Sequence, residues 1–119
     1  MAWGGLGPTR YQYAPAVRQV VRELSSAFPA ARANTYVCHP WCGWGRYSVD
    51  WWGPGGRGDP IDRQLGWSLL NYAFHLGHGP SLRHTIYLHQ LWTSFGGYSF
   101  WREDDHSGRL RHVHLTYWK

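Results

Sequence analysis

The strand-like segment "RHVHLTYW" at 111–118 carries two histidines, His112 and His114, separated by one residue. Most of its other residues are apolar, β-branched or aromatic, and such residues favour an extended strand. Side chains alternate between the two faces of a strand, so both imidazoles project from the same face. Such a pair can offer nitrogen ligands to one metal ion, and zinc accepts histidine nitrogen together with carboxylate oxygen. The alternative is two histidines on a half-exposed sheet face.

Asp50 and His39 complete a candidate set of metal ligands. Asp50 lies in the strand-like run "YSVDWWG", where an aspartate is unfavourable unless it is paired or binds a metal. Pairing with Arg46 is the alternative. His39 ends another short extended run, "NTYVCHP". If the strands that carry His39, Asp50 and His114 are adjacent, the set predicts one Zn²⁺ ion with three protein ligands and a position open for water, as catalytic zinc sites have.

Two helices and several strands are expected to position these residues. Apolar residues at helical spacing predict a first helix over about 14–27. Asp59 as N-cap and Pro60 at the first helical position predict a second helix that ends near Gly77. Extended segments, with a hairpin turn at "TSFGG", are predicted at 34–40, 47–53, 85–92, 98–103 and 112–118. Two helices followed by antiparallel strands indicate an α+β fold with one antiparallel sheet of about four to five strands.

The chain length of 119 residues suits a single domain, 1–119, with an irregular N-terminal arm over 1–13. Hydrophobic residues make up 43% of the chain, which is enough for one core. The net charge of +5 raises the question of an anionic partner. The eleven arginines are scattered and form no nucleic-acid-binding motif, so we predict no nucleic acid partner. No apolar stretch is long enough to span a bilayer, so we predict no membrane partner. The sequence leaves the oligomeric state open.

The chain has two cysteines, Cys38 and Cys42, in the motif "CHPWC". A disulfide across so short a loop stabilises little by chain entropy. A local disulfide, two buried thiols and part of a metal site all fit this spacing, so the state of the pair stays open.

The order of His39, Asp50 and the closing "HVH" motif resembles the zinc D-Ala-D-Ala carboxypeptidase and L-Ala-D-Glu endopeptidase group, which shares the Hedgehog/DD-peptidase fold. The blocks "NTYVCHP", "SVDWWGPGGRGDPI" and "RHVHLTYW" are also similar to wall-peptidase domains of actinobacteria and their phages, over residues 32–118. The resemblance implies this fold, with zinc bound by His39, Asp50 and His114. It also implies a metallopeptidase whose substrate is a peptidoglycan peptide.

The catalytic residues are less directly implied, because the chain departs from the family in two places. The interval from His39 to Asp50 is longer than is usual in the family. Arg111 occupies the position, three residues before the last ligand, where the family commonly has an acidic general base. We therefore expect Asp105, from the preceding turn, to act as the general base, with the other acidic residues of "EDD" as alternatives.

Two further residues are expected to contact the substrate. His112, on the same face as His114, is expected to stabilise the oxyanion or orient the water. Arg32, which precedes the first ligand-bearing strand, is expected to bind a substrate carboxylate.

The predicted function is zinc-dependent hydrolysis of a stem or cross-bridge peptide in peptidoglycan, as in a carboxypeptidase or a phage endolysin. The N-terminus shows no secretory signal, which suits delivery by a phage or as part of a virion that acts on the cell wall. The alternative is a non-catalytic wall-binding or virion structural module with a structural zinc or no metal. Cys38, His39, Cys42 and a histidine of the closing strand would then form a closed four-ligand site.

Overall fold

The computed structural model describes residues 13–35, 44–101 and 111–119, and these form two α-helices and one six-stranded sheet. The helices are α1 (Pro15–Ala27) and α2 (Arg63–Phe74). The strands are β1 (Arg32–Thr35), β2 (Ser48–Trp52), β3 (Leu82–Tyr87), β4 (Gln90–Thr93), β5 (Gly97–Phe100) and β6 (Val113–Tyr117). A short 3-10 turn, η2 (Gly45–Tyr47), leads into β2. The α+β class is as predicted, but the sheet has more strands than the expected four to five.

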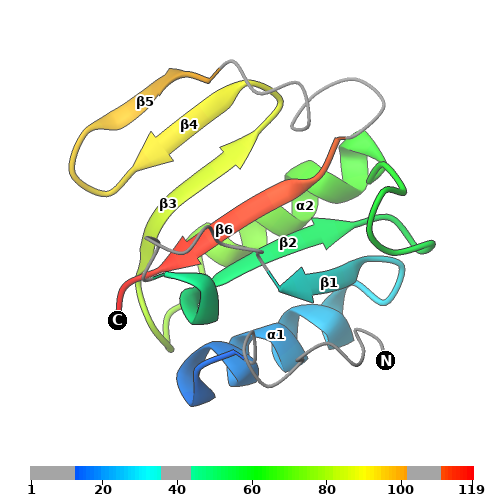
Figure 1. Ribbon diagram of the computed structural model, residues 1–119, viewed down its shortest axis with the longest axis horizontal. Coiled ribbons are helices and arrows are strands. Elements are labelled where there is room, and N and C mark those ends of the chain that lie inside the picture. Colours follow the sequence, from blue (N-terminus) through cyan, green and yellow to red (C-terminus); the bar gives the residue numbers. More distant parts are fainter. Residues whose placement is uncertain (1–12, 36–43, 102–110) are drawn as a thin grey trace.

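The sheet is antiparallel throughout and has the order β1-β2-β6-β3-β4-β5 (Figure 1). The closing strand β6 therefore lies inside the sheet, between β2 and β3. Its register places His114 directly opposite Asp50 on β2 and Ile86 on β3. The strands that carry Asp50 and His114 are neighbours, as the zinc prediction requires.

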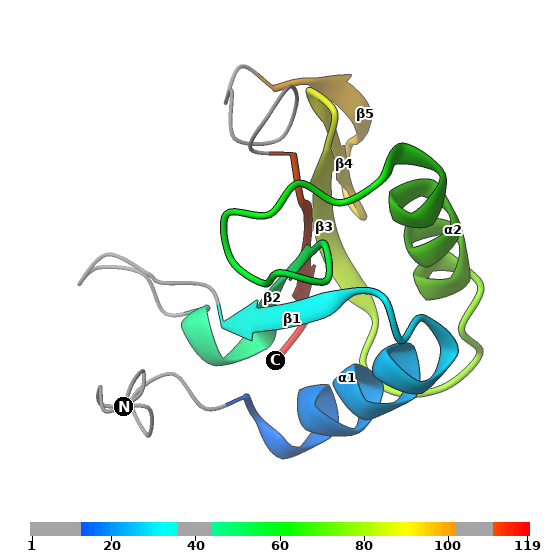
Figure 2. The ribbon, with the colours of Figure 1, turned by 90° about the vertical axis from the view of Figure 1, so that its right-hand side faces the viewer.

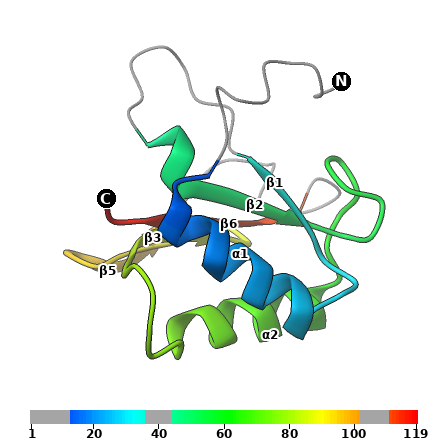
Figure 3. The same cartoon turned by 90° about the horizontal axis from the view of Figure 1, so that it is seen from below.

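Both helices cover one face of the sheet, as the view from the side and the view from below show (Figures 2 and 3). The apolar residues of α1 recur at helical spacing, and Val17, Val20 and Leu24 are buried as that spacing predicts. They join Leu69 of α2 and Trp51 of β2 in a single core. None of the described helices is both long and apolar enough to span a bilayer.

The start of α2 differs from the prediction. The N-cap is Asp62, whose Oδ2 accepts hydrogen bonds from the backbone N–H groups of Gln64 (3.1 Å) and Leu65 (3.2 Å). The predicted N-cap, Asp59, instead closes the preceding turn, where its Oδ2 accepts from Gly55 N–H at 2.6 Å. Both aspartates are good cap residues, and local sequence does not decide between them.

A contact with the residue that leads into β6 explains why α2 begins later than predicted. The N–H of Ile61 donates to the carbonyl of Arg111 at 2.9 Å, and the Arg111 Nε donates back to the Ile61 carbonyl at 2.6 Å. Ile61 is fully buried. The pair of hydrogen bonds ties Ile61 to the segment that enters β6, so the helix begins only after this residue.

The predicted strand 85–92 is two strands. β3 and β4 pair as a hairpin whose two turn residues, Leu88 and His89, have positive φ angles of 49° and 65°. A two-residue turn of this kind matches the twist of the paired strands, but it usually contains Asn or Gly. The predicted hairpin at "TSFGG" is confirmed between β4 and β5, and all four residues of β5 are exposed at the edge of the described sheet.

Gly66 allows α2 to pack closely on β3. A Cβ at this position would overlap the Tyr87 hydroxyl and lie 2.5 Å from Tyr87 Cζ. We expect Gly66→Ala to lower the free energy of unfolding by about 1–3 kcal/mol, as overpacking does, although alanine is the better helix former. Urea unfolding measures this change.

Gly77→Ala is the matched control, because a Cβ there meets nothing within 4 Å and Gly77 has no positive φ angle. Its unfolding free energy should stay within about 0.5 kcal/mol of the parent. Equal effects of the two substitutions would contradict the close packing of α2 on β3.

Candidate functional site

The sheet face opposite the helices carries a row of polar and aromatic side chains. On β2, Val49 and Trp51 are part of the core, so strand alternation directs Ser48, Asp50 and Trp52 to the other face. The same alternation on β6 directs Val113, Leu115 and Tyr117 into the core and leaves His114 and Thr116 on the opposite face. The two rows meet because the register pairs the strands residue for residue.

Asp50 and His114 are in direct contact. Asp50 Oδ1 lies 2.8 Å from His114 Nδ1 and 3.7 Å from His112 Nε2. The Asp50 side chain is only 15% exposed and the two imidazoles 7% or less, so the carboxylate is poorly hydrated. A carboxylate in such a place is costly without a partner, and two imidazole nitrogens supply it.

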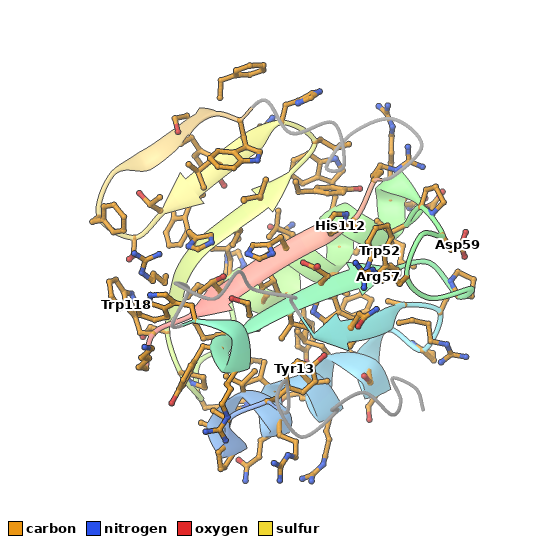
Figure 4. All side chains as sticks on the ribbon, in the orientation of Figure 1. Tyr13, Trp52, Arg57, Asp59, His112 and Trp118 are labelled. Atoms are coloured by element: carbon orange, nitrogen blue, oxygen red, sulfur yellow. The ribbon has the colours of Figure 1, made fainter. Side chains whose placement is uncertain are left out.

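His112 is oriented by Trp52. The two rings stack, with centroids 4.1 Å apart and planes 20° apart. Figure 4 shows the pair side by side at one end of the sheet face. The stack fixes the plane of the imidazole, so that its Nε2 is held near the Asp50 carboxylate.

Tyr13 also lies close enough to Asp50 for the negative charge of the carboxylate to act on its hydroxyl. This residue falls in the segment that was predicted as an irregular arm. The chain is held here by a hydrogen bond from the N–H of Ala14 to the carbonyl of Arg46, at 2.9 Å. Burial raises the pKa of the Tyr13 hydroxyl, and the negative charge of Asp50 raises it further. Tyr13 is therefore a neutral phenol at neutral pH.

His84 is the main residue of the site that sequence analysis missed. It lies on β3, and its Nε2 is 3.3 Å from His114 Nε2, with the ring planes 17° apart. Its other nitrogen, Nδ1, lies 3.0 Å from the Arg83 Nη1. The predicted strand began at Thr85, one residue too late to include it. Alternation within "LRHTIY" was the available signal, since Thr85 and Tyr87 face the core and His84 does not.

Two hydroxyls continue the network on the far side of His114. Its Nε2 is 2.9 Å from Thr116 Oγ1, which is 2.8 Å from Ser48 Oγ. Ser48 Oγ is in turn 3.0 Å from the carbonyl of Trp44. Ser48, Thr116 and His114 are all at most 4% exposed, so these polar groups depend on one another.

Of the other predicted site residues, Arg32 and Arg111 lie within the described part of the chain. Arg32 lies on β1 opposite Trp52, and its exposed side chain donates from Nε to the Pro54 carbonyl at 3.3 Å. Arg111 holds the segment before α2 through Ile61, as described above. The remaining predicted residues lie outside the described part of the chain: Cys38, His39, Cys42, Glu103, Asp104 and Asp105.

The described residues supply part of the predicted zinc site. Asp50 and His114 are adjacent and offer one oxygen and one nitrogen, which is donor chemistry that zinc accepts. Within residues 13–35, 44–101 and 111–119, no group of three His, Cys, Asp or Glu side chains is arranged to hold a metal ion. The third predicted ligand, His39, lies outside these ranges, so the complete site stays a prediction.

Comparisons with models of known protein families, with curated proteins and with solved structures give no significant match. Function is therefore inferred from the residues and their geometry, together with the motif resemblance described above.

The low pKa of His84 predicts a pH dependence of stability. Burial, followed by the neighbouring His114 and Arg83, lowers the pKa of His84 from its ordinary value of 6.5 to about 3. Between these values the unfolded chain binds a proton at His84 that the folded protein excludes, so the unfolding free energy falls as the pH falls. We expect His84→Gln, which cannot bind that proton, to lose less stability than the parent between about pH 7 and about pH 4.

Urea unfolding at several pH values in this window gives the two slopes. His75→Gln, at an exposed position after α2, controls for the loss of a histidine elsewhere. Parallel curves for the parent and His84→Gln would show that His84 takes up its proton equally in both states.

Proposed function

We propose that this protein is a zinc-dependent peptidase that hydrolyses a peptide bond in peptidoglycan, within a Hedgehog/DD-peptidase-like fold. The observation that supports this most directly is the contact of Asp50 with His114 on neighbouring strands. Two residues 64 apart in the sequence, both taken from the resemblance as metal ligands, lie 2.8 Å apart in the fold. The resemblance alone supplies the choice of peptidoglycan as substrate and of a phage or virion as the source.

Three residues would hold the metal. Asp50 would contribute a carboxylate oxygen, His114 the Nδ1 that faces it, and His39 the third ligand. When bound, zinc lowers the pKa of a coordinated water and polarises the scissile carbonyl. The antiparallel pairing of β2 with β6 holds the first two donors in place before any metal binds, which reduces the conformational cost of forming the site.

His112 and Arg32 would act on the substrate. His112 is stacked on Trp52 and directed at Asp50, so it is held close to the reacting centre. In this place an imidazole stabilises developing negative charge on the carbonyl oxygen by donating a hydrogen bond. The Arg32 guanidinium is exposed on the neighbouring strand β1 and is suited to a substrate carboxylate.

Asp105 would act as general base. It would take a proton from the attacking water and deliver it to the leaving amine. Arg111, at the position that is acidic in the family, is excluded from this role because its guanidinium cannot accept a proton and binds the Ile61 carbonyl.

A non-catalytic wall-binding or structural module is the second candidate, and one observation favours it. Both ring nitrogens of His114 already contact polar partners, Asp50 on one side and Thr116 and His84 on the other. A buried network of this kind also serves to fix one strand register, without any metal. Zinc binding and hydrolysis separate the two candidates.

Zinc binding tests the ligand assignment. We expect native mass spectrometry to show about one zinc per chain, because two of the proposed ligands, Asp50 and His114, already lie together in the folded chain. His114→Ala should weaken zinc binding by more than about 100-fold, beyond the 10–100-fold effect of residues that only support a ligand.

His78→Ala is the matched control, because His78 is exposed and pairs with Glu23 on the helix face of the molecule. It should bind zinc like the parent. A parent protein that stays metal-free in excess zinc would refute the proposed function.

The general base has a separate test. Asp105→Ala should retain zinc but release muropeptide fragments about 10²–10⁴-fold more slowly, the range that general acid–base catalysis contributes. Mass spectrometry of defined muropeptides, with and without a chelator, measures the rate and its dependence on the metal. Digestion at the parental rate would rule out Asp105 as the base.

A further inference from the structure

His114 Nε2 is contacted from two sides, by His84 and by Thr116. A neutral imidazole has one nitrogen that donates and one that accepts. The partners of the two nitrogens therefore decide together which one carries the proton. Asp50 Oδ1 only accepts and so favours a proton on Nδ1 in the metal-free protein, and each partner of Nε2 either supports or opposes that arrangement.

The contact with His84 requires His114 Nε2 to accept a hydrogen bond. A guanidinium only donates, so Arg83 Nη1, 3.0 Å from His84 Nδ1, makes that nitrogen an acceptor. Because this nitrogen can carry no proton beside the guanidinium, His84 is a neutral imidazole. Its proton is then on Nε2, from which it donates to His114 Nε2 at 3.3 Å. The proton of His114 must lie on Nδ1, where it donates to Asp50 Oδ1 at 2.8 Å.

The contact with Thr116 requires His114 Nε2 to donate a hydrogen bond instead. A hydroxyl and a carbonyl oxygen 3.0 Å apart attract each other only if the hydroxyl donates, so Ser48 donates to Trp44. Thr116 then donates to Ser48 at 2.8 Å, and its oxygen is left to accept from His114 Nε2 at 2.9 Å. In this pattern Nε2 of His114 carries the proton, and the lone pair of Nδ1 faces Asp50 Oδ1 at 2.8 Å. A carboxylate oxygen only accepts hydrogen bonds, so these two atoms repel each other until a cation lies between them, and this pattern is favoured only when a metal is bound.

The two patterns cannot be complete at once, because one nitrogen cannot both donate and accept. We propose that His84 and Thr116 are opposed positioning residues for His114: His84 favours the tautomer that blocks Nδ1, and Thr116 favours the tautomer that frees Nδ1 for a metal. The inference rests on the proposed function, in which His114 Nδ1 is a zinc ligand. Both tautomers have the same charge, so the choice is made by hydrogen-bond direction and not by proton uptake.

Substitutions on the two sides should change zinc affinity in opposite directions. His84→Phe keeps a ring of similar size but removes the donor, and we expect the zinc dissociation constant to fall by about 10-fold. Thr116→Val keeps the shape but removes the acceptor, and we expect the constant to rise by about 10-fold. Isothermal titration calorimetry with zinc measures both. A merely structural role would make both variants bind more weakly or leave both unchanged.

Thr85→Val is the matched control. Thr85 is a buried threonine of the same sheet on the opposite face, at 2% exposure, and its loss should leave the zinc affinity at the parental value. Arg83→Met is a second test of the His84 side, because it frees His84 Nδ1 to carry the proton. It should also strengthen zinc binding, and it keeps the proposal testable if His84→Phe does not fold.

Nitrogen-15 NMR of the metal-free protein tests the inference independently of zinc. We expect the proton of His84 on Nε2 and that of His114 on Nδ1, and zinc should move the His114 proton to Nε2. The opposite tautomer of either histidine in the metal-free protein, or affinity changes of the same sign in His84→Phe and Thr116→Val, would overturn the proposal. If the parent binds no zinc, the proposed function fails, and the metal-free tautomers alone decide the inference.

Discussion

The negative charge of Asp50 is the constraint around which one face of this molecule is built. The carboxylate lies on β2, an inner strand of the described sheet, and is largely removed from solvent. A buried charge of this kind is stable only with partners that compensate for lost hydration. Two imidazoles surround it at 2.8 and 3.7 Å, and a third histidine lies behind the first. The face is therefore a connected polar network, and each member depends on its neighbours.

One face of the sheet forms the apolar core, and the other carries the polar residues of the candidate site. Strand alternation sends Trp51, Leu115 and Tyr87 into a core closed by both helices, and this core supplies most of the apolar burial. The same strands present Asp50 and His114 on the other face. Because one register sets both faces, a slip of β6 against β2 would expose the core and separate the carboxylate from its imidazole at the same time. Selection for a stable core thus also preserves the geometry of the site.

Long-range patterns were predictable from the sequence, whereas local choices between similar residues were not. Helical spacing predicted α1, and the apolar, β-branched and aromatic residues of "RHVHLTYW" predicted β6, because each pattern extends over the whole element. The cap at Asp62 instead of Asp59 depends on the contact of Ile61 with Arg111, 50 residues away. The division of the predicted strand 85–92 into β3 and β4 depends on two non-glycine turn residues, Leu88 and His89, with positive φ angles. No local sequence motif indicates this turn.

The site shows the same division. The sequence singled out Asp50 and His114 because an aspartate and a pair of histidines are unusual in strands, and the fold places the two residues in contact. His84 was missed because its role depends on the pairing of β3 with β6, which the sequence does not reveal. Tyr13 was missed for a similar reason, since only the fold brings it near the carboxylate.

The central position of β6 has a consequence for the order of folding. Both of its neighbours, β2 and β3, precede it in the sequence and emerge from the ribosome first. Until β6 arrives, each of these strands has an unpaired edge, and direct pairing of the two is the competing arrangement. The native sheet forms only when β6 pairs with both β2 and β3, so any direct pairing of these two strands has to be undone first. Such non-local pairing slows folding, so the protein is most vulnerable to misassembly while it is still being synthesised.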